Sequence, residues 1–185
     1  GVRLVGSEMC IRDSSNLFLN EKSFASNSSF EIIPEKVSIF NENEIYLIVK
    51  FDLEKNWHTY WKNPGDSGEP ASFEWDLPKG FEISEAMWPT PELIPYPPLT
   101  TFGYTDQLEL LFKLSLPEGV KENSVIEVSS KWLVCADVCI PQEGSVSFDL
   151  FKANQTYPSQ IEQLLSKIKQ KIPLNNGKTL SLIHI

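Results

Sequence analysis

Cys135 and Cys139 are the only two cysteines that lie close together in this sequence, and three residues separate them. They belong to the segment WLVCADVCIP, which otherwise has the character of an apolar strand end. If the segment stayed extended, four steps of about 3.3 Å would place the two Cα atoms roughly 13 Å apart. A disulfide needs a Cα separation of about 4.4–6.8 Å. The two sulfurs can therefore bond only if the chain turns tightly between them.

A disulfide between these cysteines would close a very small ring. By reducing the entropy of the unfolded chain, such a bond would stabilise the folded state by only on the order of 2 kcal/mol. Stability is therefore a weak reason to keep the two cysteines. Asp137 lies between the sulfurs and disfavours a thiolate electrostatically. We therefore favour a redox pair that reacts when a partner thiolate attacks it or when a partner's surface changes its environment.

Two other interpretations of the pair remain open. The first is a structural disulfide in a non-catalytic sandwich adaptor. The second is a metal site: zinc needs about four ligands, and once the two ends of the chain are set aside only His58 remains as a further soft ligand. Cu(I) is held by thiolates, so a copper-handling module is conceivable, although no methionine cluster accompanies the cysteines. We expect no metal and no cofactor.

Other polar residues carry weaker signals. His58, in the run WHTYW, is more often a packed or surface residue than a catalytic base in such an aromatic setting. Asp66 and Glu69 belong to NPGDSGEP, a turn without the glycine spacing or the basic residue of a phosphate-binding loop. We interpret these two acids as solvated charges or as acids near the disulfide. No Ser–His–Asp order and no spaced carboxylate pair stands out.

The formal net charge of −9 argues against nucleic acid and against an anionic membrane surface as partner. No apolar run approaches the roughly 20 residues needed to span a bilayer. We therefore expect no direct membrane contact for this stretch of chain.

Both ends of the sequence differ in character from the rest. Residues 1–14, GVRLVGSEMCIRDS, and residues 181–185, SLIHI, resemble translated sequencing adapters, and we interpret both as artefact. This excludes Cys10 and His184 from the functional argument. Residues 15–29, rich in Ser and Asn, are expected to be disordered or the remnant of an export signal.

Alternation of apolar and polar residues dominates the chain from residue 30 onwards. Such alternation over many short segments, separated by turn residues, predicts an all-β antiparallel sandwich over residues 30–152. Residues 88–104 carry five prolines, which cannot donate to a sheet ladder, so we expect a long aromatic-bearing loop there. Apolar residues at helical spacing predict a helix over 159–172. Residues 153–180 are then either a helix packed on the sandwich or a linker to a missing module, and we favour the linker.

Four sequence blocks in order resemble a known family. The blocks are WHTYWKNPGDSGEP, W-P-x-P, TTFGY and WLVCADVCIP, and the resemblance runs from about residue 30 to residue 152. They are similar to the N-terminal periplasmic domain of the thiol–disulfide reductase DsbD, with the ScsB-type branch most alike. The resemblance implies an immunoglobulin-like sandwich in the periplasm, as a domain of an inner-membrane protein.

The resemblance also implies an activity. In the family, a thioredoxin-like domain of the same membrane protein reduces the cysteine pair. The pair then reduces periplasmic disulfide isomerases, cytochrome c maturation factors or related thiol proteins. The chain would thus be the electron-relay part of a protein-disulfide reductase, a thiol–disulfide oxidoreductase. By the family's pattern, Cys139 is the nucleophile and Cys135 the resolving thiol.

An aromatic cap loop shields the disulfide in the family, and Phe102 and Tyr104 match it best here. The chain also departs from the family. The best-known members have five residues between the cysteines rather than three, and an acidic pair just before the cap aromatic, where this chain has Thr100 and Thr101.

Acid-assisted proton transfer in this chain would therefore have to come from other carboxylates. The three acids available for it are Asp137, Asp66 and Glu69.

Overall fold

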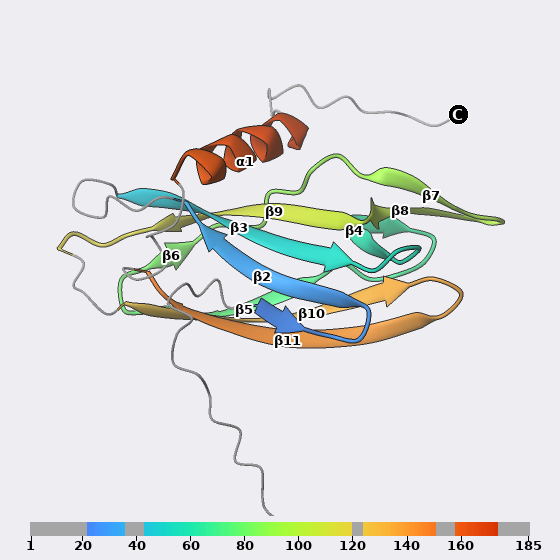
Figure 1. Ribbon diagram of the computed structural model, residues 1–185, viewed down its shortest axis with the longest axis horizontal. Coiled ribbons are helices and arrows are strands. Elements are labelled where there is room, and N and C mark those ends of the chain that lie inside the picture. The colour runs from blue at the N-terminus through green and yellow to red at the C-terminus, as the bar shows by residue number, and fades with distance from the viewer. Residues whose placement is uncertain (1–21, 36–42, 120–123, 151–157, 174–185) are drawn as a thin grey trace, which may run out of the picture.

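The computed structural model describes residues 22–35, 43–119, 124–150 and 158–173 (Figure 1). The expected artefact segments, 1–14 and 181–185, lie outside the described residues. Within the described ranges, no helix is long and apolar enough to cross a membrane.

Two antiparallel sheets are stacked on each other (Figure 1). In spatial order the first sheet contains β1 (Lys22–Phe24), β2 (Ser28–Pro34), β3 (Glu44–Leu53), β9 (Gln107–Ser115) and β6 (Glu82–Ile83). The second contains β11 (Cys139–Asp149), β10 (Val125–Cys135), β4 (His58–Gly65), β8 (Leu99–Thr105) and β7 (Glu92–Tyr96), while β5 (Ser72–Asp76) also pairs with β10. The predicted all-β, immunoglobulin-like sandwich is confirmed.

The core forms where the alternating faces of the two sheets meet. On β3 every second residue is buried in it, as the period of two predicts. Trp132 of β10 lies against Phe30 and Phe51 of the first sheet, with ring centroids 5.8 and 5.0 Å away. These aromatic contacts join the two layers three residues before Cys135, and so anchor the end of β10 that carries this cysteine.

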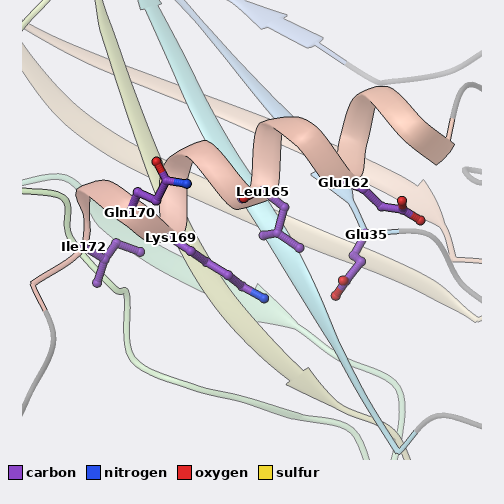
Figure 2. A pocket seen from close by; sticks show the side chains of 7 residues that line it. Glu35, Glu162, Leu165, Lys169, Gln170 and Ile172 are labelled. Carbon is purple, nitrogen blue, oxygen red and sulfur yellow. The ribbon is translucent and has the colours of Figure 1, made fainter.

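The predicted helix is present as α1 (Pro158–Lys171), and it lies across the outer face of β3 and β9 (Figure 1). Its residues Leu165 and Ile168 bury themselves against Ile48 and Leu111 of the sheet. Figure 2 shows Leu165 pointing from the helix towards these strands, in a groove of about 630 Å³ that Glu35 also lines. The segment was expected to be either a helix packed on the sandwich or a linker. In its described part it is a helix packed on the sandwich. A following module remains a prediction.

The interpretation of residues 88–104 as a loop is wrong for most of that segment. Residues 92–96 and 99–105 form the β7–β8 hairpin, and β8 is hydrogen-bonded on both sides, to β4 and to β7. The prolines fall where a sheet tolerates them: Pro95 on the edge strand β7, and Pro97 and Pro98 at the turn. The proline-free run LTTFGYT supplies the inner strand.

The sandwich also begins earlier than the predicted boundary at residue 30. Residues 22–24 form β1 and β2 starts at Ser28, so part of the segment expected to be disordered or an export-signal remnant is strand. The strand β1 has only three residues, KSF, and is too short and too polar to show the alternation that predicts a strand.

We predict that Ile168→Ala lowers the free energy of unfolding by about 2–5 kcal/mol, because the substitution leaves a cavity under α1. Ile168 is fully buried. Urea denaturation measures the change. Lys167→Ala, on the exposed side of the same helix, is the control and should change stability by less than about 0.5 kcal/mol. Equal effects of the two substitutions would show that α1 does not pack on the sheet.

Candidate redox site

The two cysteines occupy the tip of the β10–β11 hairpin. β10 ends at Cys135, β11 begins at Cys139, and the two residues pair with each other in the antiparallel register. Between them the Ala136 N–H donates to the Val138 carbonyl at 3.0 Å. The Cα atoms are 4.1 Å apart and the sulfurs form a disulfide. The tight turn that bonding requires is therefore supplied by a hairpin.

The two sulfur-bearing residues differ sharply in exposure. Cys135 is only 2% exposed, whereas Cys139 is exposed. Val138, beside Cys139 in the turn, is a large apolar side chain that is 62% exposed. A visiting protein therefore meets Cys139 and Val138 first, and reaches Cys135 only through the bond.

Tyr60 of β4 contacts both sulfurs. Its hydroxyl donates to the Cys135 Sγ at 2.8 Å and lies 3.6 Å from the Cys139 Sγ. The Tyr60 side chain is itself 2% exposed. The disulfide thus rests on a buried phenol, and the shorter of the two contacts goes to the buried sulfur.

A glycine covers the ring of Tyr60. Gly68 has φ +95°, a conformation that favours glycine, and a Cβ added there would lie 2.1 Å from the Tyr60 ring. The loop that carries Gly68 is tied to β8, because the Asp66 carboxylate accepts from the Thr100 N–H at 2.8 Å. The Ser67 and Thr101 hydroxyls, 3.1 Å apart, add a second tie.

His58 is the residue of β4 that lies directly opposite Cys135. It pairs with Cys135 on one side and with Thr105 of β8 on the other. Its imidazole meets the Tyr60 ring edge-on, with centroids 5.4 Å apart. Burial lowers the pKa of His58 from its ordinary value of 6.5, so the neutral imidazole is favoured beside the disulfide.

The predicted acids lie on two segments of the chain, Asp137 in the β10–β11 turn and Asp66 and Glu69 in the segment at the end of β4. Asp137 is exposed in the turn between the cysteines, and Asp66 is engaged with Thr100. Glu69 is exposed and lines a surface groove together with Leu133 and Pro141 of the hairpin. Assistance by any of these carboxylates stays a prediction.

The predicted cap aromatics lie away from Tyr60. Tyr104 is buried in the core, where it stacks on Trp88 and donates to the Pro89 carbonyl at 2.8 Å. Because neighbouring strand residues point to opposite faces, Tyr104 faces away from the side that Thr105 shares with Cys135. Tyr104 is therefore a core residue, which corrects its assignment to the cap.

Phe102 lies on the same side of β8 as Tyr104, two residues away, and its ring meets that of Trp61 at 6.4 Å. The Tyr60 ring is instead covered by the loop that carries Gly68. Shielding of the disulfide by Phe102 stays a prediction.

Tyr60 is the site residue that the sequence analysis missed. The run WHTYW contains it, and strand alternation places His58 and Tyr60 on one face, which was the available signal. The pairing of β4 with β10, more than 70 residues later in the chain, is what brings that face to the disulfide. Among the described residues, no group of three or more His, Cys, Asp or Glu side chains is placed to hold a metal ion.

Comparison with known proteins identifies the family. Residues 31–150 match the model of the N-terminal region of the thiol:disulfide interchange protein DsbD. This chain belongs to the DsbD N-terminal domain family. The disulfide at the hairpin tip is thus the cysteine pair of a thiol:disulfide interchange domain. No curated protein sequence matches the chain.

One solved structure has a similar fold. The N-terminal periplasmic domain of ScsB from Proteus mirabilis is similar with a TM-score of 0.65 and 18% identity; the match covers 83% of this chain and 59% of that one. The reduced N-terminal domain of Neisseria meningitidis DsbD matches with a TM-score of 0.39 and 15% identity, over 68% of this chain and 88% of that one. The chain therefore spans less than two thirds of the ScsB structure.

We predict that His58 makes stability depend on pH. Because the pKa of His58 is lowered in the folded state, the unfolded chain binds a proton first as the pH falls through about 6.5. The contribution of His58 to the free energy of unfolding is therefore fully present above that pH. It is lost as the pH falls towards the pKa of His58 in the folded state.

Urea denaturation between about pH 8 and pH 5 measures this effect. The free energy of unfolding of the natural protein should fall relative to that of His58→Gln as the pH decreases. His184 is common to both proteins and cancels. Parallel pH profiles, or a relative gain at low pH, would contradict the prediction.

Proposed function

We propose that this DsbD-type domain relays electrons by thiol–disulfide exchange through Cys135 and Cys139. The observation that carries the proposal is the disulfide at an exposed hairpin tip, with one accessible and one buried sulfur. A structural disulfide needs no such access, whereas exchange requires a visiting thiolate to approach one sulfur in line with the bond.

In the first half of the relay the domain accepts two electrons. A thiolate of the donor attacks the Cys139 Sγ, the bond to Cys135 breaks, and its electron pair stays on the Cys135 sulfur. The donor's second thiolate then attacks the donor sulfur of this mixed disulfide and releases Cys139. The donor leaves as a disulfide, and the two domain thiolates take up protons from the solvent to give the dithiol.

In the second half the domain donates the electrons. The Cys139 thiolate attacks the acceptor's disulfide and forms a mixed disulfide, and one acceptor thiolate leaves. The Cys135 thiolate then attacks the Cys139 Sγ, which restores the intramolecular disulfide and releases the acceptor's second thiolate. In this scheme Cys139 is the nucleophile and Cys135 the resolving thiol.

The proposal places the domain in the periplasm, as part of an inner-membrane protein-disulfide reductase. The electron donor is a thioredoxin-like domain of the same protein. The acceptors are periplasmic thioredoxin-fold or isomerase proteins, or factors of cytochrome c maturation. Family membership supports this setting, and the ScsB neighbour was itself solved as a periplasmic domain.

Single cysteine variants test the division of roles. In a Cys10→Ser background, the reduced Cys135→Ser protein should form a mixed disulfide with glutathione disulfide at least about tenfold faster than Cys139→Ser, because only Cys139 is exposed. Mass spectrometry over time measures the adduct.

Equal rates, or faster capture by Cys139→Ser, would contradict the assignment of Cys139. The reduced protein with both cysteines is the control and should return to the intramolecular disulfide. If it fails to exchange with glutathione disulfide at all, the pair is a structural disulfide and the relay is wrong.

A further inference from the structure

We propose that the Tyr60 hydroxyl stabilises the thiolate that leaves from Cys135, and so directs exchange to Cys139. This rests on the proposed relay and adds to it a third residue that contacts the reacting atoms. The role requires a donor that is close to one sulfur, shielded from water and held in place, and the geometry of Tyr60 meets each requirement.

The hydroxyl favours one sulfur over the other. It lies 2.8 Å from the Cys135 Sγ and 3.6 Å from the Cys139 Sγ. When a partner thiolate bonds to Cys139, negative charge develops on the Cys135 sulfur, which is the nearer of the two. The hydrogen bond is therefore stronger after the bond breaks than before, because its acceptor becomes an anion.

Burial makes this hydrogen bond matter. Cys135 and Tyr60 are each only 2% exposed, so water has little access to the leaving sulfur. A thiolate without a partner in such surroundings is strongly disfavoured. Tyr60 supplies a donor at the place where the charge appears, and it keeps its proton throughout: the attacking thiolate gains a bond to Cys139 and the electron pair ends on Cys135.

Two neighbours hold the phenol in place. The His58 imidazole meets the Tyr60 ring edge-on, with centroids 5.4 Å apart. Gly68 approaches the same ring so closely that no side chain fits there. The hydroxyl is thus already oriented before a partner arrives, and little reorganisation is needed during the reaction.

The same contact serves the return step. In the dithiol, a hydrogen bond from Tyr60 favours the ionised form of Cys135, which is the form that attacks Cys139 to release the acceptor. One residue thus assists both the opening and the closing of the disulfide.

Tyr60→Phe tests this role because it keeps the ring and removes the hydroxyl. The matched control is Tyr104→Phe, which removes a buried hydroxyl from the neighbouring strand. That hydroxyl donates to the Pro89 carbonyl and not to a sulfur. The rate at which dithiothreitol reduces the disulfide should fall about ten- to a hundredfold in Tyr60→Phe, the range expected for a hydrogen bond to a charged group. It should stay within about threefold of the natural protein in Tyr104→Phe.

A second measurement separates this role from a structural one. In a Cys10→Ser background, NMR of carbon-labelled cysteine follows the ionisation of each thiol in the reduced protein. The midpoint for Cys135 should move to higher pH in Tyr60→Phe, while that for Cys139 moves less. Tyr104→Phe should move neither.

Unchanged reduction rate and unchanged Cys135 midpoint in Tyr60→Phe would overturn the proposal, as would equal effects in both variants. Failure of the relay is distinguishable from these results. If the reduced natural protein does not pass electrons to any disulfide, the proposed function fails, and the Cys135 midpoint still decides whether Tyr60 stabilises the thiolate.

Discussion

The antiparallel pairing of β10 with β11 is the constraint on which the site depends. The register runs without a break from Val125 opposite Asp149 to Cys135 opposite Cys139, and it is anchored in the core by Trp132. The disulfide closes only a small ring at the end of this ladder, so it adds little to the stability of the hairpin. The fold therefore positions the sulfurs, and the bond between them is free to open and close while the scaffold stays intact.

From that constraint follows the asymmetry of the pair. The end of β10 lies beside β4, which buries Cys135 against Tyr60, whereas the start of β11 is left at the surface. One sulfur is presented to a partner and the other is kept in a shielded, hydrogen-bonded place. In thiol–disulfide exchange these are the requirements of the attacked sulfur and of the leaving sulfur. The Gly68 loop, tied to β8 through Asp66, completes the shield on the ring of Tyr60.

Patterns between residues close in the sequence predict the strands, the helix and the cysteine pair, because these features depend on local sequence. Alternation on β3 and β9, the apolar spacing of α1 and the cysteine pair were all recognisable, and the four motif blocks were enough for the family. The roles of Tyr60 and Tyr104 could not be predicted in this way, because they depend on which strands pair in the folded protein. Tyr60 becomes a site residue only because β4 pairs with β10, and Tyr104 becomes a core residue because of the side of β8 on which it falls. The prediction of a loop at β7 is wrong for a related reason. An edge strand tolerates proline, but the sequence does not show which strand is at the edge of the sheet.

The reduction potential of the Cys135–Cys139 pair decides whether the pair can act as a relay, because a relay must gain and lose electrons under the conditions in which it works. Equilibration of the protein with dithiothreitol buffers of known potential, followed by alkylation and mass spectrometry, measures it. We expect a value above about −300 mV, where the disulfide is readily reduced by partner thiols. A value below about −300 mV, typical of inert structural disulfides, would contradict it.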